Sequence, residues 1–231
     1  MKAQSIKAIA FDLDGTLIDS VPDLAAATQD MLAELNLTLC NEQQVRSWVG
    51  NGAAKLVERA LTFARGEPVT QADIDDAMPL FSKHYEANLQ QHSRLYDGVK
   101  PVLEQLAEQG YQLAVVTNKP YRFTVPLLAA FGIDHLFHEV LGGDSLAKMK
   151  PDPLPLNHLK QQWQLNDEQL LMVGDSRNDI LAAKAAGISS IGLTYGYNYG
   201  EDIGLSGPTA VCDTFKEVLA QITDSQIVLE Q

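Results

Sequence analysis

The chain of 231 residues combines a hydrophobic content of 45% with a formal net charge of −13. This composition allows a large buried core and excludes a disordered or fibrous protein. The acidic balance opposes binding to nucleic acid and to anionic membranes, because affinity for both depends on lysine and arginine. We therefore expect neither a nucleic-acid partner nor a membrane partner.

The features that report on location point to the cytoplasm. The short apolar stretch at the N-terminus is interrupted by Lys7, which disfavours a signal peptide, and no run reaches membrane-spanning length. Cys40 and Cys212 lie far apart in the sequence and match no metal-ligand spacing. The sequence thus predicts a cytoplasmic protein with free thiols, with a pairing of the two cysteines as the alternative.

The first predicted strand, Ile6–Phe11, ends in two acidic residues. Side chains alternate between the faces of a strand, so Asp12 and Asp14 point the same way and can serve one site. Gly15 then allows a sharp turn, and Thr16 adds a hydroxyl group. An acidic turn that merely caps the strand is the alternative.

The stretch that follows, 17–96, has the periodicity of helices rather than strands. Pro22 suits the first turn of a helix, and apolar residues then recur on one helical face. These residues are Leu24, Ala27, Met31 and Leu35. We predict a helical cap domain over 17–96, inserted into a core domain formed by 1–16 and 97–231.

From residue 97 onward, strands and helices alternate. We expect strands at Leu113–Val116, Glu139–Leu141, Leu170–Val173 and Ser189–Leu193, and helices over Val99–Leu106, Tyr121–Phe131, Leu154–Trp163 and Asn178–Ala186. The segment Tyr195–Gly207 is predicted to be a surface loop. Such alternation predicts a Rossmann-like, doubly wound α/β fold, in which ligands bind at the carboxyl ends of parallel strands.

Three further polar motifs fall at the ends of predicted strands or in the loops between them. They contain Thr117 and Asn118; Lys150; and Asp175, Asn178 and Asp179. A hydroxyl, an amide and a lysine suit the binding of an oxyanion, and the two carboxylates repeat the pattern of the first motif. Taken singly, they are also explained as a strand terminator, an exposed loop lysine and acidic residues at a helix N-terminus.

In this order the four motifs resemble those of the haloacid dehalogenase superfamily of phosphotransferases, over nearly the whole chain. Within it, 19–24, 49–52, 117–120 and 150–153 are similar to the phosphoglycolate phosphatase family. The resemblance implies a phosphatase for a small phosphorylated metabolite, with 2-phosphoglycolate as the expected substrate and a monomer or homodimer as the assembly. The alternatives are a phosphomutase of the β-phosphoglucomutase type, a phosphatase or pyrophosphatase for another small phosphate, and a non-catalytic binding protein.

A divalent cation follows from the charges. A phosphate dianion beside Asp12 and Asp175 would gather several negative charges, and oxygen-only ligands select a hard ion such as Mg²⁺. The resemblance implies that Asp12, Asp175 and the backbone carbonyl of Asp14 hold it. It also implies that Asp12 is the nucleophile, that Asp14 is the general acid and base, and that Thr117 and Lys150 bind the phosphoryl oxygens.

The remaining site residues are expected to support this centre or to select the substrate. Asp179 is assigned to the outer shell of the metal, Asn178 to the support of Lys150 or its loop, and Asn118 to substrate binding. In the predicted cap, Gly50, Asn51, Gly52 and Lys55 are expected to meet the end of the substrate remote from phosphorus. The two glycines let backbone N–H groups approach an anion there, although a simple helix-entry turn is the alternative.

Overall fold

The computed structural model describes residues 6–223, so positions 1–5 and 224–231 of the predicted core domain lie outside it. Six strands form one parallel sheet in the order β5-β4-β1-β6-β7-β8. They are β1 (Ala8–Phe11), β4 (Gln112–Val116), β5 (Glu139–Leu141), β6 (Leu170–Gly174), β7 (Ser189–Leu193) and β8 (Ala210–Cys212). The doubly wound α/β fold is therefore confirmed. Strand β8 was not anticipated from the sequence.

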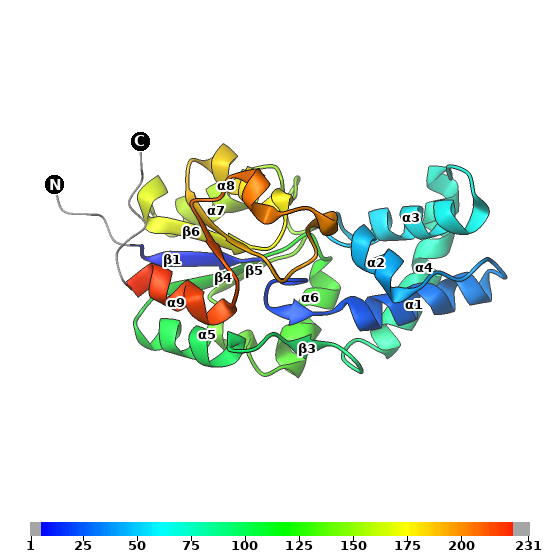
Figure 1. Ribbon diagram of the computed structural model, residues 1–231, viewed down its shortest axis with the longest axis horizontal. Coiled ribbons are helices and arrows are strands. Elements are labelled where there is room, and N and C mark those ends of the chain that lie inside the picture. The colour runs from blue at the N-terminus through cyan, green and yellow to red at the C-terminus, as the bar shows by residue number, and fades with distance from the viewer. Residues whose placement is uncertain (1–5, 224–231) are drawn as a thin grey trace.

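Helices cover both faces of this sheet (Figure 1). They are α5 (Val99–Glu108), α6 (Tyr121–Ala130), α7 (Leu154–Gln162), α8 (Arg177–Ala186) and α9 (Phe215–Thr223). Short 3₁₀ turns occur at Asp134–Leu136, Asp167–Gln169, Asn198–Gly200 and Ile203–Ser206.

The alternation of side chains along β1 explains the layers. Ile9 and Phe11 belong to a buried cluster with residues of α5 and α9, and the rings of Phe11 and Phe215 are 5.8 Å apart. Ala8 and Ala10 belong to a separate cluster with residues of α7 and α8. Because β1 is buried on both faces at the centre of the sheet, the two acidic residues that follow it emerge at the middle of the strand ends.

Residues 21–87 contain four helices: α1 (Val21–Glu34), α2 (Glu42–Trp48), α3 (Ala53–Arg65) and α4 (Gln71–Ala87). We call them the helical unit. They share a hydrophobic cluster that includes Leu24, Ala27 and Met31, so the predicted apolar face is buried as expected. Leu35 is only half-buried, since α1 ends one residue before it. Figure 1 places the helical unit beyond the carboxyl ends of the sheet strands.

The two chain crossings between the sheet and the helical unit pair with each other. Strand β2 (Ile18–Asp19) and strand β3 (Arg94–Leu95) form an antiparallel ribbon, with Ile18 opposite Leu95 and Asp19 opposite Arg94. Each strand has only two residues, so hydrophobic periodicity gave no signal for them. The ribbon holds the entry and the exit of the helical unit side by side.

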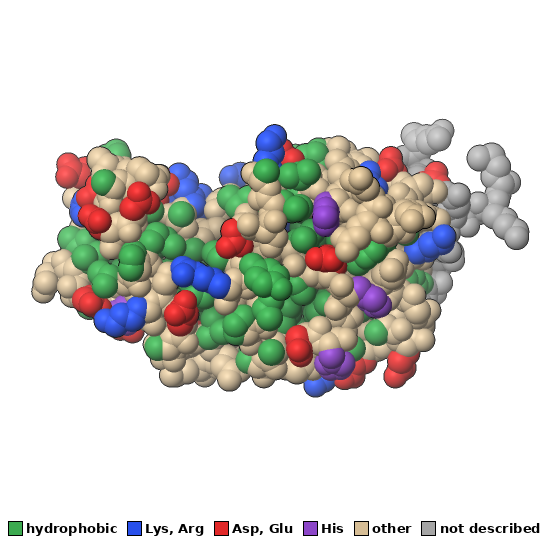
Figure 2. Space-filling view, turned by 180° about the vertical axis from the view of Figure 1, so that it is seen from behind, with side chains coloured by type: hydrophobic (Ala, Val, Ile, Leu, Met, Phe, Trp, Pro, Cys, Tyr) green, Lys and Arg blue, Asp and Glu red, His purple; other side chains and the backbone are tan. Residues whose placement is uncertain are grey.

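The charged side chains of one face of the molecule are mixed and not gathered by sign. On the face drawn in Figure 2, acidic side chains are scattered, and the lysines and arginines shown form no continuous patch. None of the described helices is both long and apolar enough to cross a membrane. Cys40 and Cys212 are both buried as free thiols, which agrees with the prediction of unpaired cysteines.

Candidate active site

A cavity lies where the strand ends face the helical unit, and its space of about 520 Å³ includes the open solvent at its mouth. From the core it is lined by Asp12, Asp14, Thr117, Asn118, Lys119, Phe123, Lys150, Ser176, Asn178 and Asp179, and from the helical unit by Leu24, Val49, Gly50, Gly52, Ala53, Leu56, Phe81 and Tyr85. The fold thus brings residues of all four sequence motifs to one place.

Lys150 is buried between two carboxylates. Its Nζ lies 2.8 Å from Asp12 Oδ1 and 2.6 Å from Asp179 Oδ1. Burial by itself lowers the pKa of Lys150, but the charges of Asp12 and Asp179 raise it above its ordinary value. Burial also raises the pKa of the Asp12 carboxyl to about 6, although Lys150 opposes that rise. Lys150 is therefore a fixed positive charge beside Asp12.

Asp175 completes a cluster of three buried acids. Its side chain accepts hydrogen bonds from Thr16 Oγ1 at 2.7 Å and from the backbone N–H of Tyr197 at 2.8 Å. Burial, followed by the charges of Asp12 and Asp179, raises the pKa of Asp175 well above its usual value. Carboxylate oxygens of Asp12, Asp175 and Asp179 lie within 4.8 Å of one another. Three carboxylates beside one lysine leave an excess of negative charge, which suits a hard divalent cation.

Two glycines bring the backbone close to Asp175. Gly15 has a φ of +95°, which L side chains rarely adopt, and a Cβ atom there would lie 2.9 Å from Asp175 Oδ1. A Cβ atom at Gly196 would collide with the side chain of Asp175 itself. Asp175 is thus enclosed by two backbone segments that tolerate no side chain.

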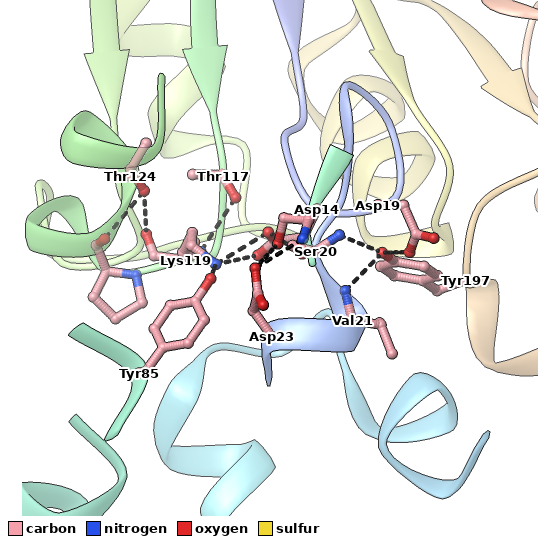
Figure 3. A network of polar contacts seen from close by, with 12 residues as sticks. Asp14, Asp19, Ser20, Val21, Asp23, Tyr85, Thr117, Lys119, Thr124 and Tyr197 are labelled. Carbon is pink, nitrogen blue, oxygen red and sulfur yellow. Dashed lines mark hydrogen bonds and ion pairs between the residues drawn. The ribbon is translucent and has the colours of Figure 1, made fainter. Parts of the chain in front are cut away.

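Asp14 has a lysine partner that the sequence reasoning did not assign. Lys119 Nζ lies 3.1 and 3.2 Å from the two oxygens of Asp14 and donates to the hydroxyl of Tyr85 at 2.6 Å (Figure 3). Ser20 Oγ also donates to Asp14, at 2.6 Å. Although burial lowers the pKa of Lys119, the charge of Asp14 raises it above the ordinary value. The only sequence signal was its position directly after the Thr117-Asn118 motif.

The two residues of that motif contribute in different ways. Thr117 is buried at the cavity, and its Oγ1 accepts from the backbone N–H of Lys119. Asn118 uses its amide N–H groups to bind the carbonyls of Gly50 at 3.0 Å and Lys150 at 2.9 Å. Its Oδ1 is a buried side-chain atom with no hydrogen-bond partner among the described residues. Asn118 therefore joins the helical unit to the loop of Lys150 and does not offer N–H groups to a ligand.

Asn178 supports the segment of Gly50, whereas the sequence predicted that it would support Lys150 or its loop. Its Nδ2 donates to Gly50 O at 3.0 Å and to Tyr199 Oη at 3.1 Å. Asn51 is held beside it, since its Oδ1 accepts from Tyr199 and from Arg59, both at 2.9 Å. Gly50 and Gly52 line the cavity, whereas Asn51 is used in these structural contacts.

Lys55 is not brought to the cavity, in contrast to its expected role. Its side chain is 44% exposed and forms an ion pair with Glu58 at 2.7 Å. The helical period explains the difference: Ala53 and Leu56 of α3 line the cavity, and Lys55 points about 100° away from Leu56 around the helix.

The segment Tyr195–Gly207 is more than the predicted surface loop, because Tyr197 and Asn198 are buried. Tyr197 Oη accepts from the backbone N–H groups of Ser20 at 3.0 Å and Val21 at 3.3 Å, and it donates to Asp19 Oδ1 at 2.8 Å. The segment thus links Asp175 to the first turn of α1. The closely spaced tyrosines of this segment were the available signal.

Comparison with known proteins agrees with this architecture. Residues 9–193 match the model of the haloacid dehalogenase-like hydrolase family, and the chain therefore belongs to that family. It is 51% identical over 92% of its length to a phosphoglycolate phosphatase of Haemophilus influenzae (strain 86-028NP), 96% of which is covered. It is 48% identical over 96% of its length to a phosphoglycolate phosphatase of Colwellia psychrerythraea, 99% of which is covered.

Solved structures give the same answer for the fold. The crystal structure of a predicted phosphoglycolate phosphatase from Haemophilus somnus superposes with a TM-score of 0.90 at 46% identity, covering 94% of this chain and 98% of that one. The structure of CbbY from Rhodobacter sphaeroides, in complex with phosphate, superposes with a TM-score of 0.79 at 25% identity, covering 92% and 96%.

Proposed function

We propose that the protein is a Mg²⁺-dependent phosphatase that hydrolyses 2-phosphoglycolate to glycolate and phosphate in the cytoplasm. One observation supports the reaction class: two carboxylates line the same cavity, and each has a different lysine partner. Asp12 lies beside Lys150, and Asp14 lies beside Lys119. The choice of substrate rests on the relatives, which are named phosphoglycolate phosphatases.

In this proposal Asp12 is the nucleophile. One of its oxygens attacks phosphorus, and the ester bond breaks to give an aspartyl-phosphate and the leaving oxygen of glycolate. Asp14 donates its proton to that oxygen and then takes a proton from the water that hydrolyses the aspartyl-phosphate. Lys150 and Thr117, both buried at the cavity, stabilise the charge that develops on the phosphoryl oxygens.

The metal would be held by Asp12, Asp175 and the backbone carbonyl of Asp14. When bound, Mg²⁺ neutralises the charge of the phosphoryl group and of the carboxylates around it. Asp179 acts through its ion pair with Lys150, and its second oxygen accepts from Ser176 N at 2.9 Å and Ser176 Oγ at 3.0 Å. We assign Asp179 to the support of this centre and not to the set of direct ligands.

Residues 17–96, which contain the helical unit, are proposed as the cap that closes on the strand ends and excludes water during the reaction. The hydrogen bonds from Asn118 and Asn178 to the carbonyl of Gly50 support this role, because they join the helical unit to the phosphate-binding motifs. The paired strands β2 and β3 are its hinge.

A panel of phosphate esters with Mg²⁺ tests the function. We expect kcat/KM for 2-phosphoglycolate to exceed that for glycerol phosphates by about 10-fold to 100-fold. Asp12→Asn should remove turnover with the fold intact, whereas the exposed control Asp76→Asn should keep it. Activity of Asp12→Asn within about tenfold of wild type would exclude Asp12 as the nucleophile. Faster hydrolysis of pyrophosphate, or conversion of β-glucose 1-phosphate to the 6-phosphate, would contradict 2-phosphoglycolate as the preferred substrate.

A further inference from the structure

Two lysines are buried among the residues that the structure describes, and both line the cavity. Lys150 lies at the Asp12 end, where its partners are Asp12 and Asp179. Lys119 lies at the Asp14 end and contacts neither of those acids. A lysine removed from water is costly unless anions face it, and here the carboxylates of Asp12, Asp14 and Asp179 do so. The cavity therefore carries a fixed positive charge at each of its two ends.

One donor beside Lys119 is not used by the protein, and it belongs to Tyr85. An ammonium group has three N–H donors, and Lys119 directs them toward Asp14 Oδ1, Asp14 Oδ2 and Tyr85 Oη. Because Tyr85 accepts from Lys119, its own hydroxyl hydrogen remains available. No acceptor for that hydrogen is found within residues 6–223. Lys119 and Tyr85 can thus offer charge and a hydrogen bond to a ligand.

The position of Lys119 matches the reach of a small acid. A general acid lies about 2.6–3.2 Å from the oxygen that it protonates, here the ester oxygen beside Asp14. In 2-phosphoglycolate the carboxylate carbon is only two bonds, of about 1.5 Å each, from that oxygen. Lys119 Nζ is 3.1 Å from Asp14 Oδ1. With the ester oxygen in contact with Asp14, a carboxylate two bonds away can reach Lys119, and Tyr85 Oη lies 2.6 Å from Lys119 Nζ.

The surroundings strengthen an ionic contact there. The rings of Phe81 and Phe123 lie 5.8 and 5.1 Å from the ring of Tyr85, and both line the cavity. In such a low-dielectric environment a carboxylate bound to Lys119 gains more than in water. The position also needs both parts of the protein, because Tyr85 belongs to α4 of the helical unit and Lys119 follows β4.

We propose that Lys119 and Tyr85 form the subsite for the carboxylate of the substrate and thereby determine the preference for phosphorylated acids. This assignment rests on the proposed function and replaces the role expected for Lys55. The phosphoryl group would occupy the Lys150 end of the cavity and the carboxylate the Lys119 end. Figure 3 shows Lys119 between Asp14 and Tyr85, as the subsite requires.

The test compares two substrates in each variant. One is 2-phosphoglycolate, and the other is 2-hydroxyethyl phosphate, in which a neutral alcohol replaces the carboxylate. Lys119→Met should lower the ratio of the two kcat/KM values by about 10-fold to 100-fold, and Lys119→Arg should restore much of it. Tyr85→Phe should lower the ratio about threefold or more while Lys119 keeps its charge. The matched control Lys55→Met should leave the ratio unchanged.

The outcomes distinguish a failure of the carboxylate subsite from a failure of the proposed function. If wild type shows no preference for 2-phosphoglycolate, the proposed substrate fails. If wild type shows the preference and Lys119→Met lowers both kcat/KM values equally, Lys119 only positions Asp14 and the subsite is overturned. If Lys119→Met does not fold, as judged by circular dichroism, Tyr85→Phe decides: an unchanged ratio overturns the subsite, and a lowered ratio supports it.

Discussion

Tyr197 provides the most direct test of how the sheet and the helical unit are joined. Helix α1 has no side-chain hydrogen bond from its own N-cap residue, Ser20. Instead, the hydroxyl of Tyr197 accepts from the backbone N–H groups of Ser20 and Val21, and all three groups are buried. Removal of that hydroxyl in Tyr197→Phe leaves two buried N–H groups without their acceptor and Asp19 without one donor.

The expected loss of stability follows from these contacts. Each buried group left without a partner costs about 1–3 kcal/mol, and loss of a helix cap costs typically about 1 kcal/mol. We therefore expect Tyr197→Phe to lower the free energy of unfolding by about 2–4 kcal/mol. In a protein of this size that corresponds to a fall in Tm of roughly 4–16 °C.

Urea denaturation followed by circular dichroism measures this change, with calorimetry as a second readout. The control is Tyr121→Phe, because the side chain of Tyr121 is half-exposed and its hydroxyl has no hydrogen bond among the described residues. The backbone N–H of Tyr197 that binds Asp175 is kept in the variant, so the Mg²⁺ requirement should change little. A loss below about 0.5 kcal/mol in Tyr197→Phe would refute the assignment of its hydroxyl as the cap of α1.

Three further outcomes are expected at the acidic cluster. Gly196→Ala should raise the Mg²⁺ concentration needed for half-maximal activity at least about tenfold, because the added Cβ collides with Asp175. The control is Gly200→Ala, where φ is positive but no atom lies near the added Cβ. It should lower the free energy of unfolding by about 1 kcal/mol and leave the Mg²⁺ requirement unchanged. Excess Ca²⁺ should inhibit in steady-state assays, since the larger ion accepts more ligands and can engage both oxygens of Asp12; full activity in a chelator would exclude a metal. The third concerns pH. Burial raises the pKa of the Asp12 carboxyl to about 6 from 3.8, so the folded metal-free protein holds that proton more tightly and this group costs stability as pH rises through that interval. A protonated Asp12 cannot hold the metal, so calorimetry should find no rise in Tm on adding Mg²⁺ below about pH 5 and the full rise above about pH 7. An equal rise at both pH values would contradict the assignment of Asp12 as a metal ligand.

Local patterns in the sequence were enough to predict most strands of the core sheet and to place its polar motifs at the strand ends. Apolar runs with turn residues between them predicted five of the six sheet strands, and the period of two placed Asp12 and Asp14 on one face. Because parallel strands present their carboxyl ends at one edge, the motifs at Thr117 and Asp175 could be placed near Asp12 without a structure. These inferences depend on local patterns, which the chain carries in every conformation.

How the sheet and the helical unit meet could not be predicted from local patterns, because it depends on long-range packing. Lys119, Tyr85 and Tyr197 belong to different segments, and their contacts depend on how the helical unit sits on the sheet edge. Asn118 has its amide committed to Gly50 by the same packing. Lys55 is close in sequence to residues that line the cavity, and that is all the sequence could indicate. The orientation of α3 about its own axis directs the Lys55 side chain toward Glu58 and solvent. Such orientations follow from the packing of buried apolar faces. The contacts named above join residues 34, 68 and 177 positions apart, where no local pattern can reach.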